Sequence, residues 1–152
     1  MTKYVSKVAC DNFRLQATSF NFPNGSVLLI NTYFPCDPQK DSFDDTELLN
    51  LLADIQTLVA QSQCAHVLIA GDLNCHFNRY NRFTYTVQEF MEEINLILLW
   101  LNPDSNPNHR IDTVDLTYCS VNNGIASYST LDHFAMSQQL FNAVAEAGVI
   151  NT

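Results

Sequence analysis

The sequence predicts an α/β domain built around a strand–helix–strand unit. Two apolar runs, at residues 27–30 (VLLI, continuing into Asn-Thr-Tyr) and 66–70 (HVLIA), have the continuity of strands that are buried on both faces. Between them, apolar residues at helical spacing predict a helix that fades near residues 61–63. Because a helical crossover joins parallel strands, we expect the two strands to be parallel neighbours.

The elements before the second strand follow in chain order. Residues 14–20 alternate loosely in polarity and precede a Pro-Asn-Gly cluster at residues 23–25, which predicts a hairpin into the first apolar run. The helix is expected to begin with Asp44 as its N-cap and Glu47 three residues later, which is a capping-box pattern.

Two further helices and a hairpin are predicted after the second strand. Apolar residues at helical spacing indicate a helix over residues 86–100, ended by the Pro/Asn-rich loop 102–108. The Asn-Gly pair at residues 123–124 predicts a hairpin turn between arms at 115–121 and 125–135. A short final helix, residues 138–147, is expected to stop at a glycine.

Composition indicates one compact domain. The chain has 152 residues, of which 47% are hydrophobic, and no repeat or linker divides it. The five cysteines are scattered without a CxxC pair, so we expect reduced, mostly buried thiols rather than a zinc or redox site. The longest apolar stretch is too short to span a bilayer, and residues 1–11 lack the apolar core of a signal peptide. We therefore expect an intracellular protein, nuclear or cytoplasmic.

The charge is strongly acidic. Seven Lys and Arg residues against sixteen Asp and Glu residues give a net charge of −9. This balance argues against a simple DNA-binding module, because contacts of basic side chains with phosphate dominate nucleic-acid affinity. The acidic charge does not exclude an enzyme that binds phosphate through a metal ion held by carboxylates.

Three polar side chains are expected to meet at one edge of the sheet. Tyr33 ends the first apolar strand, and Asp72 and Asn74 follow the second in the tetrapeptide Gly-Asp-Leu-Asn. Hydrolysis of a phosphoester needs a group that orients or activates water, for which Asp72 is suited, and donors to phosphate oxygens, for which Tyr33 and Asn74 are suited. Taken alone, the tetrapeptide also fits a simple Asx turn after a strand.

Three motifs in the same order resemble the endonuclease/exonuclease/phosphatase family. They are residues 27–35 (VLLINTYFP), residues 67–74 (VLIAGDLN) and residues 129–137 (STLDHFAMS), with a Thr-aromatic step at Thr117-Tyr118 before the third. The family includes exonuclease III, abasic-site endonucleases, DNase I, inositol-phosphate 5-phosphatases and the endonuclease domains of non-LTR retrotransposons. The resemblance implies a two-sheet, four-layer α/β sandwich of the DNase I type, with helices outside.

The resemblance also assigns site residues. Asp72 looks like the aspartate that activates or positions the attacking water, and Asn74 like its companion that contacts the phosphate. Tyr33 resembles the tyrosine that hydrogen-bonds the scissile phosphate, and Asp132 the aspartate that orients the catalytic histidine. For the complete domain, the family implies Mg²⁺ as cofactor and DNA as substrate.

The histidines receive no catalytic role. His133 follows Asp132 directly, and neighbouring residues of a strand point to opposite faces, so we expect His133 to be structural. His66, His76 and His109 have no partner at metal-ligand spacing and are expected to be solvent-exposed or to cap backbone groups.

The sequence departs from the family at both ends. Nothing before Arg14 supplies the family's upstream asparagine and metal-binding glutamate, and no Ser-Asp-His follows the last predicted helix. We therefore expect residues 1–152 to be one partial domain, incomplete at both ends, with an unknown principal metal ligand and weak or no activity. Uncovered sheet surface also predicts self-association.

Three functions are compatible with these patterns. Residues 92–96, 131–134 and 147–150 resemble the endonuclease domains of retrotransposons more than they resemble repair enzymes. This resemblance implies DNA nicking, and fusion to or origin from a reverse-transcriptase polyprotein. A phosphatase of the same family, acting on a small or lipid phosphate, suits the acidic charge better. The third function is a non-catalytic remnant or binding module that keeps the fold without the site.

Overall fold

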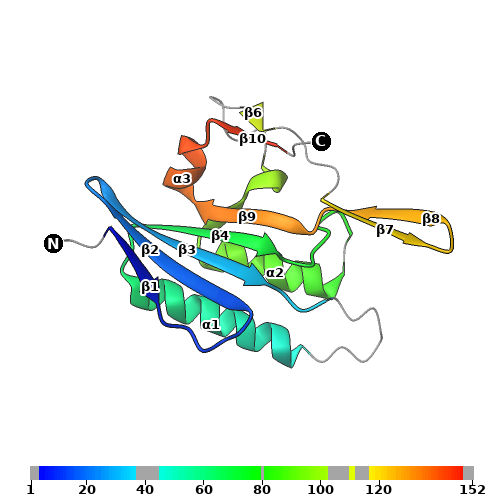
Figure 1. The fold of residues 1–152 in the computed structure, drawn as a ribbon, viewed down its shortest axis with the longest axis horizontal. Helices are drawn as coiled ribbons and strands as arrows, with labels where there is room; N and C mark the ends of the chain where they lie inside the picture. The colour runs from blue at the N-terminus through cyan, green and yellow to red at the C-terminus, as the bar shows by residue number, and fades with distance from the viewer. Residues whose placement is uncertain (1–3, 37–44, 80, 103–109, 112–116, 149–152) are drawn as a thin grey trace.

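A mixed six-stranded sheet forms the centre of the computed structural model, which describes residues 4–36, 45–79, 81–102, 110–111 and 117–148 (Figure 1). The strand order in this sheet is β1-β2-β3-β4-β9-β5. Its strands are β1 (Val5–Val8), β2 (Leu15–Phe22), β3 (Gly25–Tyr33), β4 (His66–Asp72), β9 (Asp132–Ser137) and β5 (Leu96–Leu98). The predicted α/β class is confirmed.

The predicted hairpin and strand–helix–strand unit are both present. Strands β2 and β3 pair antiparallel across the Pro-Asn-Gly turn, and β3 and β4 pair parallel on either side of α1 (Thr46–Ser62). Burial alternates along β3, with Leu28 and Ile30 fully buried and Val27 and Leu29 only half-buried. The expectation of a strand buried on both faces is therefore wrong for β3, because only one of its faces is covered by helices.

Helices α1 and α2 (Arg82–Glu93) cover the same face of the sheet (Figure 1). Apolar residues at helical spacing on both helices pack against the alternate, inward-facing residues of the strands. The core contains Leu48, Leu51, Leu52, Ile55 and Leu58 of α1, Phe83, Val87, Phe90 and Met91 of α2, and Leu15, Ala17, Leu28, Ile30, Val67, Ile69, Leu96, Leu98 and Ala135 of the sheet.

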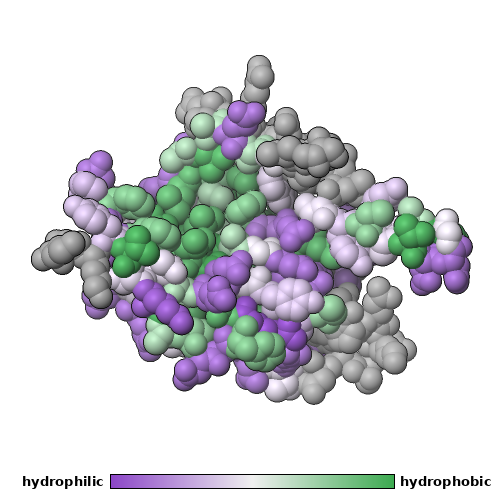
Figure 2. Space-filling view, viewed as in Figure 1, coloured by the Kyte–Doolittle hydropathy of each residue, from purple (hydrophilic) through white to green (hydrophobic). Residues whose placement is uncertain are grey.

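The opposite face of the sheet is only partly covered. Helix α3 (Gln138–Ala143) packs there through Phe141, against Met136 and the half-buried Leu68 and Ile97. Beside α3 lies an apolar area that we call the open face. It consists of the exposed Val5, Phe22 and Phe134 and the half-buried Phe20, Val27 and Leu29. Figure 2 shows green, apolar surface next to α3 on this side of the molecule.

The open face predicts concentration-dependent self-association, because exposed apolar patches on soluble domains promote association. Replacing both Phe22 and Phe134 with serine is expected to weaken association about tenfold or more. Sedimentation equilibrium measures this effect: the average mass of the double variant should lie closer to the 17.2 kDa of the monomer than that of the wild-type protein. Val121→Ser, which removes an exposed apolar side chain outside this face, is the control and should change little. If both changes weaken association equally, the prediction that the open face mediates self-association is contradicted.

Two pairs of strands lie outside the main sheet. Strands β7 (Tyr118–Asn122) and β8 (Ile125–Ser129) form a hairpin that projects from the body of the molecule (Figure 1). Its turn residues Asn123 and Gly124 have positive φ angles of 51° and 77°, as the predicted Asn-Gly turn requires. Strand β6 (Arg110–Ile111) pairs in parallel with β10 (Glu146–Ala147).

The second predicted helix ends earlier than expected. Helix α2 ends at Glu93. Two residues later, Asn95 adopts a left-handed conformation with a φ of 58°, and the chain continues as β5 and then as the 3₁₀ helix η1 (Leu99–Leu101). The prediction of a helix over residues 86–100 is therefore wrong in its second half. The apolar run after Asn95 pairs with the free edge of β9, and this pairing decides between strand and helix.

The last predicted arm and helix are also shorter. The expected arm 125–135 divides into β8 and β9, because the backbone turns at Thr130 from the hairpin into the main sheet. The expected helix 138–147 ends at Ala143, and Glu146–Ala147 form β10. Most of the predicted loop 102–108 and the start of the arm 115–121 lie outside the described residues.

The start of α1 differs from the predicted capping box. The N-cap is Asp45, one residue later than predicted, and its side chain makes no capping hydrogen bond. It forms an ion pair with Arg82 instead, and Glu47 pairs with Arg14. Asp44 lies outside the described residues.

All five cysteines are free thiols, as expected. Only Cys75 is buried, however, so the expectation of mostly buried thiols is wrong. No helix within the described ranges is long and apolar enough to cross a membrane.

Candidate active site

Three predicted site residues form a row across neighbouring strands. Tyr33 pairs with Asp72 between β3 and β4, and Asp72 pairs with Asp132 between β4 and β9. Residues directly opposite each other on neighbouring strands project to the same face of a sheet. The structure therefore brings Tyr33, Asp72 and Asp132 together at one end of the strands, on the face opposite α1 and α2.

Gly71 allows β4 to approach β3 closely just before Asp72. Its φ is +141°, and a Cβ atom at this position would lie 2.0 Å from the carbonyl oxygen of Thr32. Only glycine fits this backbone conformation and this spacing. The glycine of the Gly-Asp-Leu-Asn motif therefore has a structural role, which is to set the register that places Asp72 beside Tyr33.

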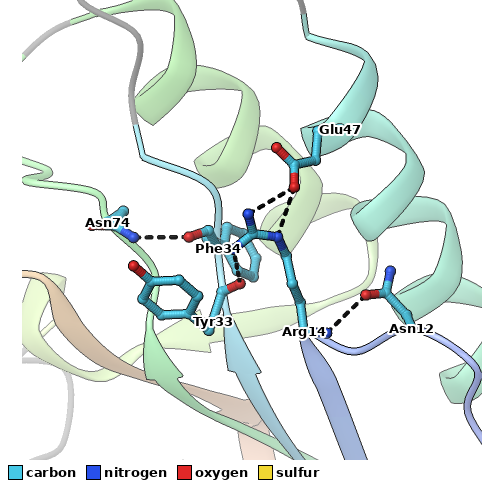
Figure 3. Close-up of polar contacts among 6 residues, drawn as sticks. All are labelled: Asn12, Arg14, Tyr33, Phe34, Glu47 and Asn74. Atoms are coloured by element: carbon cyan, nitrogen blue, oxygen red, sulfur yellow. Dashed lines mark hydrogen bonds and ion pairs between the residues drawn. The ribbon is translucent and has the colours of Figure 1, made fainter.

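A tight turn fixes the carboxylate of Asp72. The backbone N–H of Asn74, which has a φ of 49°, donates to Asp72 Oδ1 at 2.9 Å. Asn74 Nδ2 donates to the carbonyl oxygen of Phe34 at 2.8 Å (Figure 3), and the Phe34 N–H donates to the Asp72 carbonyl oxygen at 2.8 Å. The Asx turn is thus present at the site itself. One N–H of the Asn74 amide is used to hold the loop, and the predicted contact of Asn74 with phosphate stays a prediction.

The pKa of the Asp72 carboxyl is raised above its usual value. Burial is the main cause, and the negative charge of Asp132 adds to it, while the hydrogen bond from the Asn74 N–H opposes it. A carboxylate with a raised pKa is a stronger base, which suits a group that accepts a proton from water.

Arg14 and Glu47 hold Tyr33, and no sequence pattern predicts this role for them. The Arg14 guanidinium contacts Glu47 Oε1 through Nε at 2.8 Å and through a terminal nitrogen at 2.7 Å (Figure 3). Its Cζ atom lies 5.3 Å from the centroid of the Tyr33 ring, and the Tyr33 N–H donates to the Arg14 carbonyl oxygen at 3.0 Å. The half-exposed Tyr33 ring is therefore supported from one side by a cation.

His133 is structural, as predicted. Its side chain is buried on the face opposite Asp132, where Nε2 lies 2.7 Å from the carbonyl oxygen of Cys75 and 3.1 Å from that of Thr130. Because both partners are acceptors, Nε2 carries the hydrogen and donates it. The ring also packs edge-on against Phe77, with centroids 4.7 Å apart.

Neither His66 nor His76 is fully exposed, and His76 caps a backbone group, which is one of the two predicted roles. His76 is half-buried, and its Nδ1 accepts the Thr130 N–H at 3.1 Å. His66 is half-buried in β4. His109 lies outside the described residues.

Burial lowers the pKa of His133, and this predicts a loss of stability in weak acid. Above pH about 6.5 the ring is neutral in both the folded and the unfolded chain. As pH falls below that value, the unfolded chain takes up a proton that the folded chain excludes, so the free energy of unfolding decreases. Urea denaturation at pH 7.5 and 5.5 measures this decrease. In His133→Gln, which keeps an N–H donor and cannot titrate, the decrease should be smaller, and an unchanged pH dependence would contradict the prediction.

The described residues do not form a complete metal site. Among them, no three His, Cys, Asp or Glu side chains gather in a way that could hold a metal ion. Asp72 and Asp132 provide two neighbouring carboxylates, whereas Mg²⁺ prefers six oxygen ligands in a near-octahedral arrangement. Two carboxylates alone do not make such a site.

Solved structures share this fold. The endonuclease domain of TRAS1, a telomere-specific non-LTR retrotransposon, matches with a TM-score of 0.65 and 12% identity over 93% of this chain and 59% of that domain. An endonuclease/exonuclease/phosphatase family protein from Leptotrichia buccalis C-1013-b matches with a TM-score of 0.55 and 12% identity, over 90% and 50%. TDP2 from D. rerio, complexed with a single-strand DNA product, matches with a TM-score of 0.56 and 12% identity, over 90% and 55%.

The sequence itself matches no protein-family model and no curated protein. The chain spans between about half and three fifths of the length of the solved structures named above. At these identities the likeness concerns the fold. The chain has the DNase I-like fold of the endonuclease/exonuclease/phosphatase proteins.

Proposed function

We propose that this chain carries the phosphate-cleaving edge of a Mg²⁺-dependent DNA endonuclease of the retrotransposon type. The observation that carries the proposal is the row of Tyr33, Asp72 and Asp132 across three neighbouring strands of a DNase I-like sheet. A tyrosine beside two carboxylates, one with a raised pKa, is a suitable arrangement for hydrolysis of a phosphodiester by water.

Each side chain has a distinct task in the proposed reaction. Asp72 orients the attacking water and accepts its proton as the new P–O bond forms. The ester P–O bond on the opposite side of phosphorus breaks, and the leaving oxygen takes a proton from solvent water. Tyr33 donates its hydroxyl hydrogen to a phosphate oxygen and so stabilises the charge that develops there. Asp132, exposed beside Asp72, takes the place of the aspartate that orients the family's catalytic histidine, and Asn74 holds the loop that carries Asp72. A Mg²⁺ ion would supply positive charge beside the phosphate, but the described residues alone do not form a complete site for it.

Two observations support DNA as the substrate. The matched structures include an endonuclease domain and a DNA-complexed TDP2. In addition, the projecting β7–β8 hairpin leads directly into Asp132 and exposes the aromatic rings of Tyr118 and Tyr128. Exposed aromatic rings can stack on nucleic-acid bases without reading their sequence.

The acidic charge favours a second candidate. A net charge of −9 disfavours a long polyanion more than a small phosphate, because repulsion grows with the number of phosphates. A phosphatase acting on a small or lipid phosphate would use the same three side chains. A non-catalytic binding module is the third candidate, and the incomplete metal site among the described residues supports it.

Relaxation of supercoiled plasmid tests the proposal, with a protein in which residues 1–152 are extended at both ends, because the described residues alone do not complete a metal site. We expect nicked circles with Mg²⁺, none with excess EDTA, and a rate lowered about 10²-fold in Tyr33→Phe. Tyr85→Phe removes the hydroxyl of an exposed tyrosine on α2 and serves as the matched control, with an unchanged rate.

The other candidates give different results in parallel assays. Release of phosphate from inositol phosphates without plasmid nicking would select the phosphatase. No turnover on either substrate, together with no Mg²⁺-induced rise in melting temperature, would select the binding module and reject the endonuclease.

A further inference from the structure

The hydroxyl of Thr117 receives two backbone hydrogen bonds beside the candidate site. The N–H of Leu131 donates to Thr117 Oγ1 at 2.8 Å, and the N–H of Asp132 donates to the same atom at 3.0 Å. Thr117 is itself placed by the projecting hairpin, since its N–H donates to the Ser129 carbonyl oxygen at 3.0 Å. Both acceptor positions of one hydroxyl oxygen thus hold the segment that delivers Asp132.

Trp100 holds the other side of the same residue. Its indole N–H donates to the carbonyl oxygen of Asp132 at 3.2 Å. The ring packs edge-to-face on Phe134, with centroids 6.0 Å apart and planes at 74°. The N–H and the carbonyl oxygen of Asp132 are therefore each bonded to a side chain from a different segment.

These contacts lie at an end of the sheet, where strand pairing opens easily. Asp132 is the first residue of β9 and, with Asp72, forms the last pair of the β4–β9 ladder. One further backbone bond, from the Leu73 N–H to the Leu131 carbonyl oxygen at 2.9 Å, joins the two loops beyond that pair. Terminal pairs of a ladder open most easily, so the geometry of the two carboxylates depends on what holds Leu131 and Asp132 in place.

We propose that Thr117 and Trp100 are positioning residues that clamp the backbone of Asp132 and keep its carboxylate beside that of Asp72. Neither side chain acts on the substrate in this role. The catalytic consequence rests on the proposed function, whereas the clamp itself can be measured without any activity.

Three variants separate the clamp from general stability. Thr117→Val has nearly the same shape and lacks the hydroxyl, and Thr117→Ser restores it. Trp100→Phe keeps an aromatic ring and removes the indole N–H. Amide hydrogen exchange by NMR should become about tenfold faster at Leu131 and Asp132 in Thr117→Val, and stay near the wild-type rate in Thr117→Ser.

A second, spectroscopic readout reports the position of the carboxylate. Because the negative charge of Asp132 contributes to the raised pKa of Asp72, displacement of Asp132 should lower the Asp72 pKa measured by carbon NMR. We expect this change in Thr117→Val and Trp100→Phe and not in Thr117→Ser. In the plasmid assay, Thr117→Val should lower kcat about tenfold with KM unchanged, and Thr117→Ser should restore it.

Two results would overturn the clamp. One is exchange that accelerates equally at Leu29 in β3, which would mean a loss of overall stability. The other is unchanged exchange at Leu131 and Asp132 together with an unchanged Asp72 pKa. If the wild-type protein does not nick plasmid, the proposed function fails, while the exchange and pKa measurements still decide whether the clamp exists.

Discussion

Replacing Gly71 with alanine is expected to lower the free energy of unfolding by about 4 kcal/mol or more, which is a large part of the stability of a domain this size. The added methyl group would lie 2.0 Å from the Thr32 carbonyl oxygen, and the φ of +141° is itself unfavourable for alanine. The strands must therefore separate where β3 and β4 carry Tyr33 and Asp72. Urea denaturation followed by circular dichroism measures the loss.

Gly124→Ala provides the matched control for this prediction. Gly124 also has a positive φ, of 77°, but no atom lies within 4 Å of the position of an added Cβ. In this variant the free energy of unfolding should therefore fall only by the cost of placing alanine at a positive φ, about 1 kcal/mol. Equal losses in the two variants would show that the close approach to Thr32 is not what requires glycine at position 71.

Asp72→Asn is expected to have opposite effects on activity and stability. Loss of the base should lower the nicking rate about 10²- to 10⁴-fold. The asparagine side chain can still accept the Asn74 N–H and keep the turn, so the fold should be retained. Because burial raises the pKa of Asp72, the ionised carboxylate opposes folding at neutral pH, and the neutral amide should raise the melting temperature.

The pH dependence gives the sign of the stability effect. Below pH about 3.8 the carboxyl is protonated in both states and has no effect. As pH rises, the unfolded chain loses this proton first, so Asp72 lowers the free energy of unfolding until the folded carboxyl also ionises. The melting temperatures of the two proteins should therefore differ at pH 7.5 and converge at pH 3. The control is Asp54→Asn, on helix α1 and away from Tyr33, Asp72 and Asp132. A melting temperature of Asp72→Asn below that of the wild-type protein at pH 7.5 would contradict the prediction.

The strand–helix–strand unit and its site can be predicted from the sequence because local and tertiary preferences agree there. The run that ends at Tyr33 and the run that ends at Asp72 form two neighbouring interior strands of the sheet, joined by the predicted helix. Parallel pairing then brings their carboxyl ends together, which is why the pattern of residues alone places Tyr33 beside Asp72. The third strand of the row, with Asp132, is predicted from its motif.

The remaining features depend on contacts between distant segments. Ile97 and Leu98 continue the helical spacing of the apolar residues before them, yet pairing with the free edge of β9 makes residues 96–98 a strand. Arg14 and Glu47 are 33 positions apart, and the capping-box pattern that includes Glu47 does not predict a contact with Arg14, so their support of Tyr33 appears only in three dimensions. The same holds for Trp100, 32 positions from Asp132. Thr117 belongs to the Thr-aromatic step, but that pattern does not predict its hydrogen bonds to the segment that carries Asp132.

The most direct test of a phosphodiester-cleaving site at this edge uses the protein extended at both ends. It measures nicking of one supercoiled plasmid by the wild-type form and by Asp72→Asn, side by side, with Mg²⁺. We predict nicked circles with the wild-type protein and a rate at least about a hundredfold lower with the folded variant. Absence of nicking by the wild-type protein, or equal nicking by both, would contradict the assignment of Tyr33, Asp72 and Asp132 to such a site.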